Sequence, residues 1–125
     1  MPGPDNQTRT ILVVDDHASN RKLLRVTLEA EGFAVVEASD GVEALALLGQ
    51  HGVDAIVSDI LMPRMDGFRL CSQVRHSPRF GHLPLLIYTA TYLSPSDEKL
   101  ARQMGADEYL RKPVPTRELV EALGR

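Results

Sequence analysis

Two hydrophobic patterns alternate along this chain of 125 residues, and the alternation restricts the fold more than any other feature. Short apolar runs rich in β-branched residues predict strands, and stretches with apolar residues three or four positions apart predict helices after each of them. Strands that are apolar throughout and alternate with helices predict an α/β fold with a parallel sheet covered by helices on both faces. The expected strands are Thr10–Val14, Phe33–Val36, Ala55–Val57, Leu85–Tyr88 and Glu108–Leu110.

The helical stretches begin at residues that favour helix starts. Asp, Ser and Thr accept hydrogen bonds from the first unpaired backbone N–H groups of a helix. We expect Thr116 to play this part for the last helix. The expected helices cover Ser19–Glu31, a stretch from about Asp40, a stretch after Asp66-Gly67, Ser96–Met104 and a stretch from Thr116.

Length and composition indicate a single domain of ordinary globular type. The net charge is −3 and no run of Lys or Arg occurs, so we expect no nucleic-acid binding by this segment. No apolar run is long enough to span a membrane, and the N-terminal residues lack the features of a signal peptide. One cysteine, Cys71, cannot form an internal disulfide, which fits a cytoplasmic location. We expect residues 1–9 to be a flexible tail and residues 10–125 to form the domain.

Polar residues gather at the ends of the predicted strands. Asp15 and Asp16 follow the first strand, Asp59 the third, Thr89 ends the fourth, and Lys112 follows the fifth. In open α/β sheets, ligands bind outside the carboxyl ends of the strands. These five side chains are therefore expected to share one edge of the sheet.

The chemistry of this set points to a metal and a phosphoryl group. Three crowded carboxylates favour a hard divalent cation, and Mg²⁺ suits them best when a phosphate supplies further oxygens. Lys112 adds a compact positive charge, Thr89 adds a hydroxyl donor, and backbone N–H groups of the nearby loops offer an anion-binding nest. A carboxylate in such surroundings fits a nucleophile that becomes an aspartyl phosphate.

Several short motifs give this chain a family resemblance. "VVDD" ends at Asp16, "SDILMPRMDG" surrounds Asp59, "TA" begins at Thr89 and "KP" begins at Lys112. In this order, at these strand ends, they resemble the receiver domain of two-component response regulators. The resemblance covers Thr10–Leu123 and implies a flavodoxin-like fold, with a five-stranded sheet in the order 2-1-3-4-5.

The resemblance also implies a phosphoacceptor and a metal site. Asp59 would accept a phosphoryl group from a histidine kinase or a histidine phosphotransfer protein. Mg²⁺, for which Mn²⁺ can substitute, would be held by Asp15, Asp16, Asp59 and the backbone carbonyl of Leu61. The domain would be a signalling module that assists its own phosphorylation and dephosphorylation, and not an enzyme in its own right.

Further roles follow from the same resemblance. Thr89, the backbone of Ala90, and Lys112 would bind the phosphoryl group, and the Lys112–Pro113 peptide bond would be cis. Thr89 and Tyr109 would move together as a switch, although Tyr109 is equally interpretable as a half-buried core aromatic. The switch would reshape the face made by the fourth helix, the fifth strand and the fifth helix, through which a second copy of the chain can pair.

Other interpretations remain open at this stage. The chain is either a stand-alone regulator or a receiver within a hybrid or multi-sensor histidine kinase. A haloacid-dehalogenase-like phosphatase would carry a second Asp two residues after the nucleophile, where this chain has Leu61. A pseudo-receiver that binds without phosphorylation would lack one of the acidic residues or the lysine. His17 adjoins the acidic pair, but we expect its side chain to face the solvent.

Overall fold

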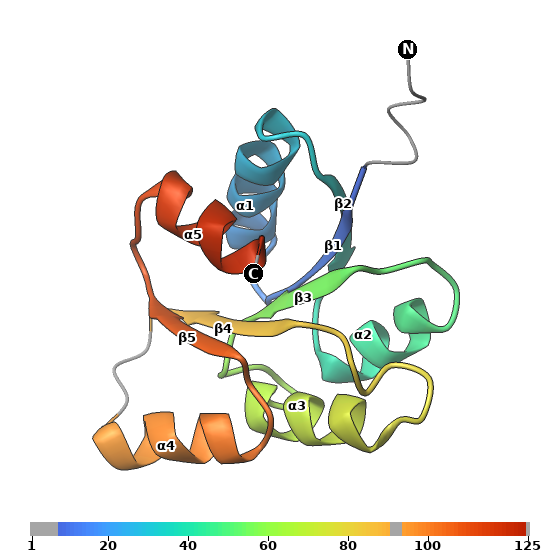
Figure 1. Ribbon diagram of the computed structural model, residues 1–125, viewed down its shortest axis with the longest axis vertical. Coiled ribbons are helices and arrows are strands. Elements are labelled where there is room, and N and C mark those ends of the chain that lie inside the picture. The colour runs from blue at the N-terminus through green and yellow to red at the C-terminus, as the bar shows by residue number, and fades with distance from the viewer. Residues whose placement is uncertain (1–7, 91–93, 125) are drawn as a thin grey trace.

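The computed structural model describes residues 8–90 and 94–124, which form a five-stranded parallel sheet (Figure 1). The strand order is β2-β1-β3-β4-β5, and every neighbouring pair is parallel. The sheet confirms the predicted fold class and the order 2-1-3-4-5. The strands are β1 (Thr10–Val14), β2 (Ala34–Ala38), β3 (Ala55–Ser58), β4 (Leu85–Thr89) and β5 (Glu108–Arg111).

Helices cover both faces of this sheet, as the sequence predicts. Figure 1 shows α1 and α5 on one face and α2, α3 and α4 on the other. One helix follows each strand, so that every connection between neighbouring parallel strands includes a helix. The helices are α1 (Ala18–Ala30), α2 (Gly41–Leu48), α3 (Gly67–His76), α4 (Pro95–Gln103) and α5 (Thr116–Leu123).

The apolar residues of the strands divide between two cores, one on each face. Successive residues of a strand point to opposite faces of the sheet. Ile11 and Val13 of β1 accordingly belong to the core under α1 and α5. Leu12 and Val14 belong to the core under α2, α3 and α4. Because both faces are buried, the central strands β1, β3 and β4 are largely apolar runs, whereas the edge strands β2 and β5 include charged residues.

Strand register brings the expected site residues to one edge. Val14 pairs with Ser58 across β1 and β3, and Thr89 pairs with Arg111 across β4 and β5. The next residue along β1 is Asp15, the next along β3 is Asp59 and the next along β5 is Lys112. The carboxyl ends of the four neighbouring strands therefore present these side chains together.

Several element bounds differ from the prediction by one or two residues, and two further details need correction. Thr116 is the first residue of α5 and not its N-cap, because the extended Pro115 (φ −58°, ψ 144°) already accepts the first hydrogen bonds through its carbonyl. Arg9 is held in the fold, since its carbonyl accepts from Ala34 N–H at 2.9 Å and its Nη1 donates to Leu123 O at 2.7 Å. Of the rest of the expected tail, Thr8 is exposed, and residues 1–7 lie outside the described residues, as does residue 125 of the expected domain.

Within residues 8–90 and 94–124, each helix is too short or too polar to cross a membrane.

The first residue of α3 lies against the backbone that directly follows β3. Gly67 N–H donates to Ile60 O at 2.8 Å, and a Cβ at position 67 would lie only 2.3 Å from Asp59 O. Real Cβ atoms do not approach backbone oxygens so closely. Glycine at position 67 therefore lets α3 pack directly against Asp59.

We expect Gly67→Ala to lower the free energy of unfolding by about 1–3 kcal/mol, because the new methyl group must displace backbone atoms. Gly49→Ala is the matched control, since its Cβ would meet Ala46 O at an ordinary 3.5 Å. Urea denaturation of both variants tests this. Equal stability of Gly67→Ala and Gly49→Ala would contradict the close packing.

Candidate functional site

Asp15 is a buried carboxylate at the end of β1, with 4% of the residue exposed. Its Oδ2 accepts a hydrogen bond from Lys112 Nζ at 3.1 Å, and its Oδ1 accepts from His17 N–H at 2.8 Å. Buried charges are stable when they are paired and hydrogen-bonded. The structure thus joins two predicted site residues that lie 97 positions apart in the sequence.

Asp16 carries an oxygen that the described residues leave unsatisfied. Its Oδ1 is buried and has no hydrogen-bond partner among them. The imidazole of His17 lies nearby, with its Nδ1 3.2 Å from Asp16 Oδ1 and 3.5 Å from Asp15 Oδ1. A buried oxygen without a donor is costly unless a cation or a water approaches it. This oxygen and the donor set around it fit a divalent metal ion.

His17 is more involved in this region than the sequence suggests. Its side chain is 67% exposed, as expected, yet its ring lies against the acidic pair. Among the described residues, Asp15, Asp16 and His17 form a set whose ligand atoms all lie within 4.8 Å of one another.

Asp59 lies half-buried at the end of β3 and is oriented by two hydrogen bonds. Its Oδ1 accepts from Thr89 Oγ1 at 2.5 Å and from Ile60 N–H at 2.7 Å. Its own N–H donates to Val14 O at 2.9 Å, which fixes it beside β1. Within the described part of the chain, no donor reaches Oδ2 of Asp59. One oxygen of this carboxylate is therefore held and the other is available.

The predicted residues thus form two neighbouring pairs at one edge. Lys112 contacts Asp15, and Thr89 contacts Asp59. The set of ligand atoms within 4.8 Å does not include Asp59, whose carboxylate is turned toward Thr89. Asp59 therefore lies at the same edge as the acidic pair but outside this compact set.

The other predicted residues lie in or beside the loops at this edge. Ala90 is exposed directly after β4, and Leu61 is 60% exposed in the loop after β3. The Lys112–Pro113 peptide bond is cis, which is the conformation expected from the sequence.

Tyr109 of β5 packs its ring against the core under α2, α3 and α4. Its hydroxyl is buried and has no hydrogen-bond partner within the described residues. Burial, together with the negative charge of Glu98, raises the pKa of Tyr109 above its usual value of 10.0. The phenol therefore keeps its proton to a higher pH in the folded state than it would in water.

Sequence reasoning missed an arginine that supports the first strand end. Arg21 of α1 donates from Nη1 to Asp15 O at 2.7 Å and from Nε to Glu37 Oε1 at 3.1 Å. Arg25 donates to the other oxygen of Glu37 at 2.7 Å, and this hydrogen bond lowers the pKa of Glu37. The turn between β1 and α1 is thus fastened to β2. Arg21 and Glu37 lie 16 positions apart and share no periodic pattern.

Comparison with known proteins identifies the family. The model of the response regulator receiver domain matches residues 11–124, which is nearly the whole chain. This chain belongs to the response regulator receiver domain family.

Named relatives and solved structures agree with this assignment. The response regulator MprA of Mycobacterium sp. (strain KMS) is 44% identical over 110 residues, which cover 88% of this chain and 46% of that protein. The chain therefore spans about half the length of such mycobacterial relatives. The chemotaxis protein CheY4 of Vibrio cholerae superposes with a TM-score of 0.87 at 35% identity, covering 94% of this chain and 98% of that one.

A further neighbour was solved with ligands. The response regulator TrrA of Thermotoga maritima, in complex with Mg²⁺ and BeF, has a TM-score of 0.82 at 32% identity. The match covers 94% of this chain and 97% of that one.

We expect Tyr109→Phe to leave stability at neutral pH unchanged or raise it by up to about 1 kcal/mol, because the hydroxyl it removes is buried and unpaired. The pKa of Tyr109 is higher in the folded than in the unfolded state, so the wild type loses stability as pH rises above 10.0. Tyr109→Phe has no phenol to ionise, so this part of the loss of stability at high pH is absent in the variant. Urea denaturation across pH tests this, with Tyr88→Phe on the neighbouring strand β4 as the control. A large loss of stability in Tyr109→Phe at neutral pH would show that the hydroxyl has a stabilising partner.

Proposed function

We propose that this receiver domain accepts a phosphoryl group from a phosphohistidine onto Asp59. The observation that carries the proposal is the asymmetry of the Asp59 carboxylate. Thr89 and Ile60 hold one oxygen, while the described residues leave the other without a donor. A positioned carboxylate with one available oxygen suits a nucleophile in phosphoryl transfer.

The reaction requires little of the protein beyond placement and charge neutralisation. Oδ2 of Asp59 attacks the phosphorus atom, the P–N bond to the imidazole breaks, and its electron pair stays on the histidine nitrogen. The Lys112 ammonium, now paired with Asp15, lies at the same edge to neutralise phosphoryl oxygens. Thr89 Oγ1–H, now donated to Asp59, turns to a phosphoryl oxygen once one is present.

The acidic residues are proposed to hold Mg²⁺, for which Mn²⁺ can substitute. The unpaired buried oxygen of Asp16 supports this most directly, since it needs a positive partner. Asp15, Asp59 and the backbone carbonyl of Leu61 complete the proposed protein ligands. The bound ion supplies charge neutralisation that lets a phosphate approach the carboxylates.

Two other functions fit the residues less well. A dehalogenase-like phosphatase needs a second acid two positions after the nucleophile, and here Leu61 is apolar and 60% exposed. A binding module without phosphorylation has no need of a retained acceptor, acidic pair and lysine, all of which this chain has. Sustained release of phosphate from small phosphoesters would favour the phosphatase.

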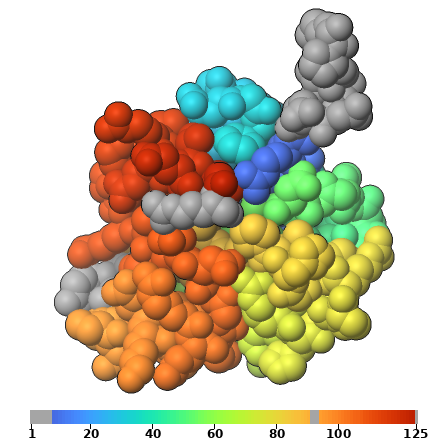
Figure 2. Space-filling model, viewed as in Figure 1, coloured from blue at the N-terminus to red at the C-terminus, as the bar shows by residue number. Residues whose placement is uncertain are grey.

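Phosphorylation is proposed to act through Thr89 and Tyr109. Movement of the Thr89 side chain toward a phosphoryl oxygen changes the space beside Tyr109, because β4 and β5 are neighbours. Figure 2 shows α5, β5 and α4 adjoining one another on one side of the molecule. We propose that this α4-β5-α5 face changes shape and binds a partner or a second copy of the chain.

The proposed donor is a histidine kinase or a histidine phosphotransfer protein, met in the cytoplasm. The proposal is the same whether the domain is a stand-alone regulator or part of a hybrid or multi-sensor kinase. Either arrangement uses phosphoryl acceptance on Asp59.

Intact mass spectrometry after incubation with a small phosphodonor tests phosphoryl acceptance. We expect one added phosphoryl group in the presence of Mg²⁺, none with EDTA, and none in Asp59→Asn. Asp54→Asn is the control, because Asp54 lies exposed at the opposite end of β3. An unchanged adduct in Asp59→Asn would assign the acceptor to another residue.

Thermal unfolding with and without Mg²⁺ tests the metal site. Mg²⁺ at about 100 times its dissociation constant is expected to add about 2.7 kcal/mol to the stability of the wild type. Asp16→Asn is expected to lose this gain and to be more stable than the wild type in EDTA, because one of two adjacent negative charges is gone. A full Mg²⁺ effect in Asp16→Asn would remove this residue from the ligand set.

A further inference from the structure

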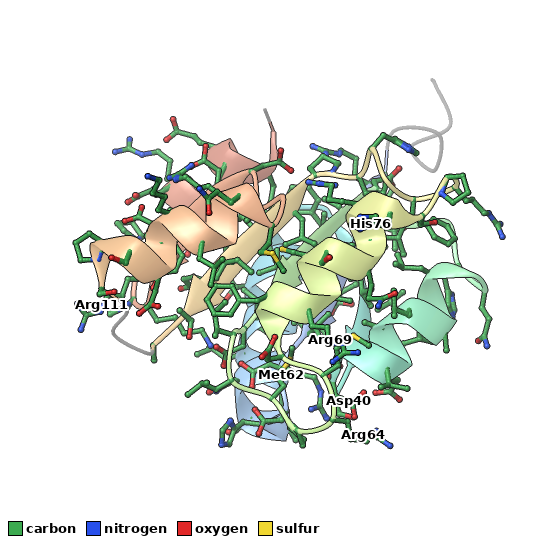
Figure 3. The ribbon with its side chains drawn as sticks, turned by 90° about the horizontal axis from the view of Figure 1, so that it is seen from below. Asp40, Met62, Arg64, Arg69, His76 and Arg111 are labelled. Atoms are coloured by element: carbon green, nitrogen blue, oxygen red, sulfur yellow. The ribbon has the colours of Figure 1, made fainter. Side chains whose placement is uncertain are left out.

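Asp40 is a second buried carboxylate, and the proposed reaction makes no use of it. The residue is 2% exposed. Its Oδ1 caps α2 by accepting from Glu43 N–H at 2.8 Å. Its Oδ2 accepts from Nε of Arg64 at 2.8 Å and also from Nη2 of the same guanidinium. Figure 3 shows Asp40 and Arg64 side by side.

The pairing keeps Asp40 charged in spite of its burial. Burial alone would raise the pKa of this carboxyl group. The hydrogen bonds from Glu43 N–H and the Arg64 guanidinium outweigh burial, so that the pKa of Asp40 lies below its usual range. A buried charge of this kind loses much of its stabilisation when one partner is removed.

Arg64 belongs to the loop of residues 60–66 between β3 and α3, directly after Asp59. It has a φ of 64°, in the left-handed region that non-glycine residues rarely adopt. Such a conformation costs free energy and persists only where other contacts impose it. The ion pair to Asp40 is such a contact.

A second contact beside the ion pair holds the same loop. The side chain of Met65 fills the space at Gly41, where a Cβ would lie 2.8 Å from Met65 Cγ and Sδ. Asp40 with Arg64, and Gly41 with Met65, therefore fasten the loop to the first residues of α2.

The fastened loop connects directly to the phosphoacceptor. Gly67 N–H donates to Ile60 O at 2.8 Å and closes the loop. Ile60 N–H in turn donates to Asp59 Oδ1 at 2.7 Å. Leu61, whose carbonyl is a proposed metal ligand, lies within the closed segment.

The geometry points to the Asp40–Arg64 ion pair as a positioning device that holds the 60–66 loop, and the Leu61 carbonyl with it, in place for Mg²⁺. This inference rests on the proposed function. Among the described residues, neither side chain is hydrogen-bonded or ion-paired to a proposed metal ligand, so both are positioning residues. The pair sets the affinity for Mg²⁺ through the loop and not through the charge of the ligands.

Two substitutions separate the ion pair from other roles of these residues. Asp40→Asn keeps a side-chain oxygen for the α2 cap but removes the negative charge. Arg64→Gly removes the guanidinium and suits the positive φ, so that backbone strain is relieved.

Asp107→Asn is the matched control. Asp107 also accepts from a backbone N–H, that of Leu85 at 2.8 Å, and from an arginine, Arg75 at 2.8 Å. It precedes β5 and so lies at the opposite end of the strands.

The experiment measures Mg²⁺ affinity by NMR titration, and amide hydrogen exchange of Ile60 and Gly67 in Mg²⁺-free protein. Asp40→Asn and Arg64→Gly are each expected to weaken Mg²⁺ binding about tenfold. The double variant should be no weaker than either single variant, because both remove the same pair. Exchange at Gly67 should accelerate in all three and stay unchanged in Asp107→Asn.

Three results would overturn the inference. The first is unchanged affinity and exchange in both single variants. The second is an unchanged Mg²⁺ affinity in Arg64→Gly together with a weakened affinity in Asp40→Asn, which would assign the effect to the helix cap. The third is an equal loss of Mg²⁺ affinity in Asp107→Asn, which would indicate general destabilisation. Failure of the wild type to bind Mg²⁺ would refute the proposed function instead, and exchange at Gly67 would still decide whether the pair holds the loop.

Discussion

Repulsion between carboxylates at one edge of a parallel sheet is the constraint around which this molecule is organised. Asp15 and Asp16 follow β1, and Asp59 follows the neighbouring strand β3. Parallel strands bring their carboxyl ends together, so the fold that buries the apolar strands also crowds these charges. Lys112 partly neutralises Asp15, and Thr89 orients Asp59, but Asp16 retains a buried oxygen without a donor among the described residues. This arrangement fits the divalent cation proposed above.

Two arginines near the site hold the loops at the carboxyl edge of the sheet in position. Arg21 holds the carbonyl of Asp15 and bonds to Glu37 on β2, which fixes the turn after β1. Asp40 and Arg64 fasten the loop after β3 to the start of α2. Both arginines act on loops that carry acidic residues, and within the described part of the chain neither is hydrogen-bonded to a carboxylate oxygen of the site. The two arginines therefore support the site through its loops.

Most of the fold and the site's location follow from the sequence, because both depend on periodicity and on strand ends. Apolar runs separated by helical patterns specify the sheet, and the residues after each run, such as Asp59 and Lys112, must then lie at its edge. The ion pairs of Arg21 and Arg64 could not be predicted from the sequence. Their partners lie 16 and 24 positions away, and long side chains reach across elements without leaving a periodic signal. The start of α5 was misplaced because the backbone of Pro115, and not a side chain, provides the cap.

The central claim is that the carboxyl ends of β1 and β3 bind one divalent ion. Mn²⁺ tests it directly, because a bound paramagnetic ion broadens the amide resonances of nearby residues. Substoichiometric Mn²⁺ is predicted to broaden resonances around Asp15, Asp16 and Asp59 first, and to lose this selectivity in Asp16→Asn. Broadening centred on other acidic residues, such as Asp54 or Asp107 at the opposite end of the strands, would contradict the account.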